Sequence, residues 1–157
     1  MSPSKRSSSR TSASSSSDAG RGRAGPLGRS HFVVDWGGRS ALSQGFAEVV
    51  FPRLLVERDA TGATPADDGA GEHLILRRGA TGALDLYDWW DRARRGQAPR
   101  RRVVTVQLLD PGGRDVLLTW RFREARPVSL TYSPLLAMES GVLMETIEIA
   151  FHAVEME

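Results

Sequence analysis

Few residues of this chain are grouped in a way that could perform chemistry. The three histidines, His31, His73 and His152, lie in separate strand-like segments, and none has a spacing used to bind a metal. We therefore expect structural or surface roles for all three. The chain has no cysteine, which excludes disulfides, cysteine-ligated zinc and thiol catalysis. No serine lies in a nucleophile-elbow motif, and no glycine-rich stretch has the lysine and strand-to-helix context of a phosphate-binding loop.

Two pairs of carboxylates come closest to an acid–base site. Asp88 and Asp91 lie three residues apart in a helical segment, and Glu145 and Glu148 three apart in a strand-like one. A general acid and base need a cleft that separates their pKa values, and a solvated surface is the simpler interpretation. The acidic stretch 66–72 lacks the ligand spacing of a calcium loop. We predict no enzyme activity, no cofactor and no metal site.

The charge of the chain is unevenly distributed. Residues 1–29 contain six basic residues against Asp18 alone, a formal charge of +5, and because the whole chain carries +2, residues 30–157 carry −3. The first 29 residues are rich in Ser, Arg, Gly and Ala and have little to bury, so we predict a disordered tail followed by one domain over 30–157. The tail could be a solvated extension, an electrostatic arm for nucleic acid or an organelle transit peptide.

Composition predicts an ordinary folded domain. Hydrophobic residues make up 40% of the chain and charged residues 25%. No apolar run approaches the roughly 20 residues that span a bilayer, and the start lacks the apolar region of a secretory signal. We therefore expect neither a membrane anchor nor a secretory leader.

Alternating polar and apolar residues predict a mainly antiparallel β domain. Strand-like segments occur at 31–36, 46–51, 53–58, 72–79, 102–110, 115–122 and 144–152. A long loop without packing residues, 59–71, separates the third and fourth segments, and a PGGR turn makes a hairpin of the fifth and sixth. The predicted fold class is α+β, a β-barrel or sandwich with one flanking helix.

The helix is predicted over 83–95, with Thr81 as N-cap and Gly96 at its end. Helical spacing places four residues on the face expected to be buried: Ala83, Leu86, Tyr87 and Trp90. Trp89 points elsewhere. Two interpretations stay open for it, an exposed contact for a partner or a cover over the seam between helix and sheet.

The stretch 120–130, WRFREARPVSL, begins as a strand with Trp120 and Phe122 on one face and Arg121 and Arg123 on the other. Pro127 is expected to break the strand and bend the chain. Together with the segment 135–155, this stretch resembles the tail-tube family of contractile phage tails and extracellular contractile injection systems. The opening strands, the strand–helix segment 74–96 and the hairpin 103–122 resemble that family in the same order, so the resemblance covers about residues 31–155.

The resemblance implies a structural protein rather than an enzyme. Family members form hexameric rings that stack into a hollow tube inside a contractile sheath. It therefore implies self-association, sheath, baseplate and tube-cap partners, possible luminal cargo, and cytoplasmic assembly into a particle that can be released. The loop 59–71 lacks the charged and Pro-Gly anchors usual for the family, so an initiator or adaptor ring at a tube end is the alternative. A nucleic-acid-binding module acting through the basic tail is a further alternative, although the net charge of −3 on residues 30–157 argues against specific nucleic-acid binding.

On this basis we expect contacts between subunits or between rings at eight residues. Three are acidic residues of the long loop, four are arginines on predicted strands and one is the tryptophan left open above: Asp59, Asp67, Asp68, Arg77, Arg78, Arg121, Arg123 and Trp89. Arg121 and Arg123 are expected to face the lumen or a neighbour.

Overall fold

The computed structural model describes residues 27–38, 45–54, 73–97 and 101–157. Seven strands and one helix follow one another in these ranges: β1 (Phe32–Asp35), β2 (Phe46–Val50), β3 (Leu74–Gly79), α1 (Asp85–Arg94), β4 (Arg102–Leu109), β5 (Val116–Tyr132), β6 (Met144–Ala150) and β7 (Ala153–Met156). All strand pairs are antiparallel. The predicted mainly antiparallel α+β class is thus confirmed.

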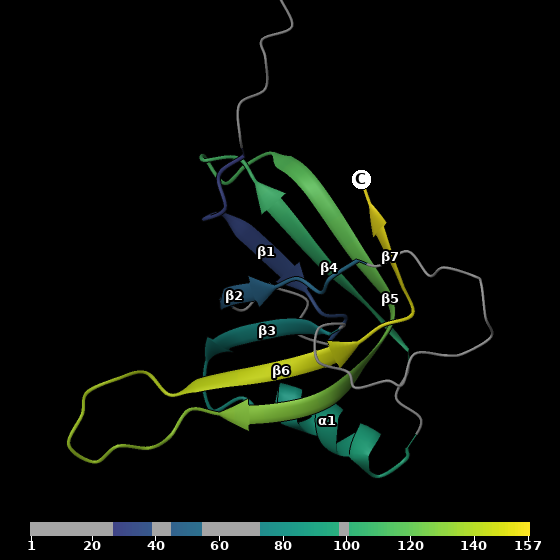
Figure 1. Ribbon diagram of the computed structural model, residues 1–157. Helices are drawn as coiled ribbons and strands as arrows, with labels where there is room; N and C mark the ends of the chain where they lie inside the picture. Colours follow the sequence, from purple (N-terminus) through teal and green to yellow (C-terminus); the bar gives the residue numbers. More distant parts are fainter. Residues whose placement is uncertain (1–26, 39–44, 55–72, 98–100) are drawn as a thin grey trace, which may run out of the picture.

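Two sheets share the long strand β5 (Figure 1). The first half of β5 lies between β4 and β7, with β1 beyond β4. The second half pairs with β6, which continues to β3 and β2. No pairing joins β1 to β2 within the described ranges, so the sheet is not closed into a barrel there.

The strand β5 corrects the expected break at Pro127. The strand continues through Pro127 to Tyr132, and Pro127 pairs with Ile149 of β6. The proline is tolerated because this half of β5 has a neighbour on one side only. The bend falls earlier, at Glu124, whose φ of 54° is the one positive value among described residues other than glycine. A register shift between Pro127 and Ser129 adds to the change of direction.

The core lies between the two sheets and is closed on one side by α1. Alternate residues of β3, β4 and β6 point into it, as the period of two requires, and Phe122 and Ala125 enter it from β5. The helix contributes Leu86 and Trp89. The buried hydrophobic residues are Val34, Trp36, Leu74, Leu76, Leu86, Trp89, Val104, Val106, Phe122, Ala125, Ile147 and Ile149.

The buried face of α1 differs from the prediction. Trp89, and not Trp90, is buried with Leu86, and Tyr87 and Ala83 are exposed. The helix begins at Asp85 with Leu84 as N-cap and no side-chain cap, so the expected Thr81 cap is wrong. The end is as predicted, because Gly96 follows the C-cap with a φ of 65°. Helical spacing did not identify the buried face, because this short helix has several adjacent apolar residues and more than one face could be buried.

Two further expectations concern strands. The segment 53–58 is not a strand at Arg53 and Leu54, and its remaining residues lie outside the described ranges. The short strand β7 was not predicted; it pairs with the first half of β5 and joins Phe122 to Val154 as partners. In the described part of the chain, no helix is long and apolar enough to cross a membrane.

Phe122 anchors the point where the two sheets meet, because its ring lies 5.0 Å from that of Phe151 and only 1% of the residue is exposed. We expect Phe122→Ala to lower the free energy of unfolding by about 3–5 kcal/mol, since the cavity can relax only in part. Urea unfolding followed by tryptophan fluorescence measures this. Val128→Ala, on an exposed residue of the same strand, is the matched control and should change stability by less than about 0.5 kcal/mol. A loss below about 1 kcal/mol for Phe122→Ala would contradict the assigned core.

Candidate assembly surfaces

A buried ion triad fixes the helix on the second sheet. Arg78 of β3 donates from Nε to Glu145 of β6 and from Nη2 to Asp85 of α1, the latter at 2.5 Å. Arg78 is 1% exposed and Glu145 3%. Burial lowers the pKa of Arg78, but hydrogen bonds to Asp85 and Glu145 outweigh burial and hold that pKa above its usual value. The triad therefore connects the helix to the sheet through buried ion pairs.

The triad also changes the interpretation of two predicted features. Arg78 was expected to contact a neighbouring subunit, but its guanidinium is enclosed by its own chain. Glu145 and Glu148 were considered as a carboxylate pair, but they lie on opposite faces of β6: Glu145 is buried, while Glu148 lies near His73 on the outer face. Alternation along a strand keeps the two apart.

The three other arginines predicted as contacts each pair with a carboxylate of the same chain. Arg77 lies 3.5 Å from Glu48 of β2, and Arg121 and Arg123 pair with Glu157 and Glu155 beside β5. As strand alternation requires, Arg121 and Arg123 lie on the face of β5 opposite to Trp120 and Phe122. Contact with a lumen or a neighbour remains a prediction for them.

The other predicted contact residues are not brought together. Asp59, Asp67 and Asp68 lie outside the described residues. Trp89 is 2% exposed, so its interpretation as an exposed contact residue is wrong, and its ring can be reached only where it lines the pocket described below. Asp91 of the other carboxylate pair binds Arg94 and Arg95 on the helix surface, which explains the lowered pKa of Asp91: the hydrogen bond from Arg94 is its largest cause.

Among the described residues, the most exposed large apolar side chains lie on a loop that the sequence analysis did not single out. The β5–β6 arm, residues 133–143, extends away from the two sheets (Figure 1). Ser133 closes its base by donating its N–H to the carbonyl of Met144, 2.9 Å away, and by accepting the N–H of Met144 at Oγ, 3.0 Å away. Large apolar side chains project from the arm: Leu135, Leu136, Met138 and Val142, exposed by 84%, 54%, 97% and 71%.

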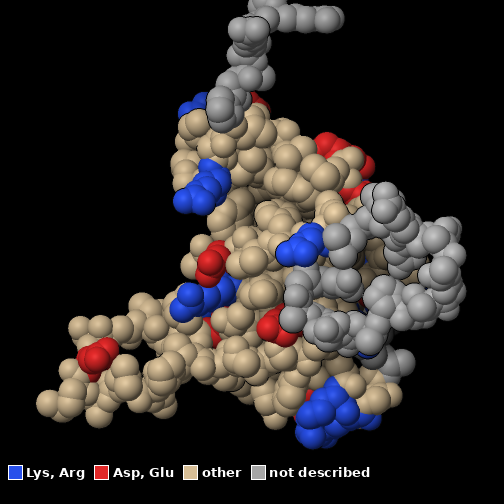
Figure 2. Space-filling view, in the orientation of Figure 1, with Lys and Arg blue, Asp and Glu red and all other residues tan. Residues whose placement is uncertain are grey.

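The arm is almost without charge. Glu139 is its one ionisable residue, and Figure 2 shows the projection as an uncharged surface with a single acidic patch. The sequence pattern that could have predicted the arm is SPLLAMESGVLM, a largely apolar stretch that contains proline and glycine and lacks the alternation of a strand. Contiguous apolar surface on a projection is typical of a protein–protein contact.

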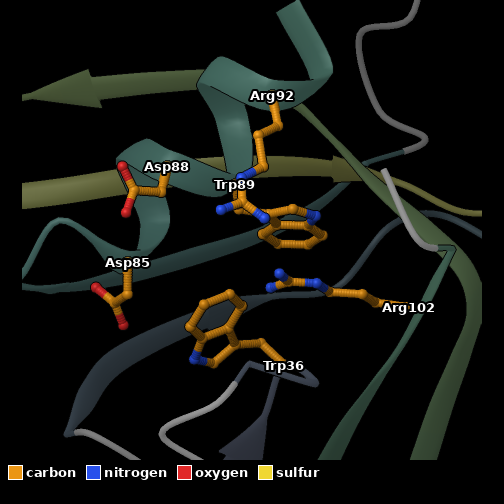
Figure 3. Close-up of a pocket in the computed structure, with 6 residues that line it drawn as sticks. All are labelled: Trp36, Asp85, Asp88, Trp89, Arg92 and Arg102. Atoms are coloured by element: carbon orange, nitrogen blue, oxygen red, sulfur yellow. The ribbon is translucent and has the colours of Figure 1, made fainter. Parts of the chain in front are cut away.

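A second feature is the tryptophan–arginine pocket, lined by Trp36, Asp85, Asp88, Trp89, Arg92 and Arg102 (Figure 3). The Arg102 guanidinium lies 4.7 Å from the Trp36 ring centroid and 4.6 Å from that of Trp89. Gly38 makes room for the first ring, because a Cβ there would come within 2.4 Å of the Trp36 indole. The cation thus lies against both indole rings, which also pack on one another with their centroids 5.5 Å apart.

Neither surface has the composition of a metal site. Within the described ranges, no three His, Asp or Glu residues lie close enough together to hold a metal ion.

The two-sheet fold with the helix α1 and the largely apolar arm is typical of a structural subunit of the tail-tube class. The chain belongs to the family described as T4-like virus tail tube protein gp19, whose model matches residues 29–155. This confirms the family resemblance seen in the sequence. A comparison with curated protein sequences finds no significant match.

Three solved structures show the same fold at low identity. A chain of the sheath/tube terminator of the PVC extracellular contractile injection system is 20% identical, with a TM-score of 0.64, and the match covers 85% of this chain and 98% of that one. A chain of the PVC sheath–tube complex is 22% identical, with a TM-score of 0.59 and coverage of 84% and 91%. A chain of the six-fold symmetrised baseplate of the anti-feeding prophage is 20% identical, with a TM-score of 0.60 and coverage of 86% and 97%.

The ion triad makes a clear prediction about stability. Arg78→Ala would leave Glu145 and Asp85 facing one another without a cation, so we expect a loss of about 3–5 kcal/mol in the free energy of unfolding. Arg94→Ala is the matched control, because its pair with Asp91 lies on the surface, and it should cost less than about 1 kcal/mol. Urea titrations of both variants measure the difference. Equal losses would show that the triad is no more than a surface pair.

The same triad predicts acid sensitivity. Burial raises the pKa of Asp85, but its hydrogen bond and charge interaction with Arg78 outweigh burial and hold the folded-state pKa below its usual value of 3.8. Because the folded state binds that proton less readily than the unfolded chain, the stabilisation is complete above 3.8 and is lost as the pH falls through the folded-state pKa. We expect Asp85→Asn to flatten the decline of the urea midpoint between about pH 5 and about pH 2. Asp115→Asn, at an exposed carboxylate, should keep the decline, and an unchanged slope in Asp85→Asn would contradict the assignment.

Proposed function

We propose that this chain is a ring-forming subunit of the inner tube of a contractile phage tail or injection particle. Family membership carries this proposal, and the exposed β5–β6 arm supports it. Leu135, Met138 and Val142 stay more than two-thirds exposed in the single chain, as expected for side chains that a neighbour covers.

The sheet edges support self-association as well. Within the described ranges, β1, β2 and β7 each pair on one side only. An unpaired edge offers backbone donors and acceptors to another strand. A head-to-tail contact between identical subunits closes into a ring when its rotation divides a full turn, and a six-fold ring is the number that the family resemblance implies.

The finer assignment follows from the same family. We propose stacked hexameric rings, assembled in the cytoplasm and enclosed by a sheath, with baseplate and cap proteins at the ends. In this ring, Arg77, Arg121 and Arg123 would contact a neighbouring subunit or the lumen through surfaces where each arginine is already paired with a carboxylate of its own chain. A terminal ring is the second candidate, favoured by the fold shared with the PVC sheath/tube terminator structure.

Residues 1–29 are proposed to be dispensable for assembly, because the domain over 30–157 contains the arm and the sheet edges. We expect light scattering to give the same oligomeric mass for the full chain and for the chain without residues 1–29. The mass should persist in high salt, since apolar contacts and strand pairing hold the ring. A phosphate-binding protein would instead lose its partner steeply as salt rises. A strict monomer at every protein concentration would contradict the proposal.

A further inference from the structure

The tryptophan–arginine pocket contains two buried hydrogen-bond donors that are not satisfied. Nη1 of Arg102 and Nε1 of Trp89 have no partner in the described part of the chain. A buried donor without an acceptor is unfavourable, because it has given up its hydrogen bonds with water and gained none in return. Trp89 is fixed by the core and Arg102 by the two indoles, so neither donor can easily turn to water. An acceptor that entered the pocket would be stabilised by these donors.

The local charges favour an acidic acceptor at Arg102. Burial and the nearby charge of Arg92 lower the pKa of Arg102, and the opposing effect of Asp85 is the smallest of the three. Asp85 is already bound to Arg78. Asp88 lies with Asp85 on the side of the pocket away from the Arg102 stem (Figure 3). A carboxylate entering between Arg92 and Arg102 would relieve the repulsion between these two cations.

The pocket is small and aromatic, which limits what it can hold. It is open to solvent on one side and has a volume of about 320 Å³, the lower end of the range for ligand sites. Two indole rings favour a flexible apolar or thioether group beside the acceptor, because methionine sulfur contacts aromatic rings well. The matching occupant is a loop tip with a carboxylate next to a methionine.

The β5–β6 arm has this composition. Met138, 97% exposed, directly precedes Glu139, the only charge of the arm. The two residues lie at a turn in which the Glu139 N–H donates to the Leu136 carbonyl at 3.3 Å. The arm of the same molecule does not line the pocket and extends away from the body (Figure 1).

We propose that the tip of the β5–β6 arm of one copy of this chain docks in the tryptophan–arginine pocket of the next copy. Glu139 accepts from Arg102, and Met138 packs against Trp36 and Trp89. Because donor and acceptor surfaces differ, the contact is head-to-tail and repeats around a ring. This inference rests on the proposed function and specifies which surfaces of the subunit meet.

Cross-linking of paired cysteines tests the docking directly, because the chain has no cysteine of its own. In Ser140→Cys/Asp88→Cys, a short bis-maleimide should link the arm tip of one copy, at the exposed Ser140, to the pocket rim of the next. We expect a ladder that extends beyond the dimer. Either single variant has one thiol and can give dimers at most. Adding Glu139→Arg to the pair should reduce the ladder about tenfold or more, as expected when a desolvated charge pair is broken, whereas adding Asp115→Arg should not.

A rescue variant separates docking from folding. Arg102→Glu combined with Glu139→Arg restores opposite charges and should recover at least part of the ladder, with circular dichroism to confirm folding. If Arg102→Glu does not fold, docking is tested by the effects of Glu139→Arg and Asp115→Arg on the cross-linked ladder. Oligomers that form normally while the cysteine pair gives no ladder, or a ladder that Glu139→Arg leaves unchanged, would overturn the docking and leave the proposed function intact. A chain that remains monomeric would overturn both.

Discussion

The hydrogen-bonded triad of Arg78, Glu145 and Asp85 is the constraint on which the rest of the fold depends. Arg78 and Glu145 are direct partners across β3 and β6, and a slip of one residue would place them on opposite faces of the sheet. Asp85 then holds the first turn of α1 against the same guanidinium. One buried cation therefore specifies both the register of the sheet and the position of the helix.

The candidate assembly surfaces follow from that position. With α1 held on the second sheet, Trp89 reaches into the core and brings its indole to 5.5 Å from that of Trp36. Arg102, at the start of β4, places its guanidinium against both rings. On the same sheet, β5 and β6 continue into the arm, whose base is closed by Ser133 and Met144. Pocket and arm are thus positioned by the same two sheets, as the proposed contact between copies requires.

Strand alternation and segment order were enough to predict the α+β class, the helix end at Gly96 and the family. They could not show that Trp89 rather than Trp90 is buried, because several adjacent residues of the helix are apolar and helical spacing alone allows more than one buried face. The continuation of β5 through Pro127 depends on an edge position that only the tertiary pairing reveals. Arg78 looked like a surface residue because its two carboxylate partners lie 7 and 67 residues away in the sequence. The arm was overlooked because an apolar run is normally assigned to a core.

The central claim is that identical copies of this chain assemble into closed rings. Negative-stain microscopy of the purified full chain, with rotational averaging of end-on views, tests it most directly. The account predicts rings with a central opening and six-fold symmetry, isolated or stacked. Particles of single-subunit size at all concentrations, or open aggregates without rotational symmetry, would contradict it.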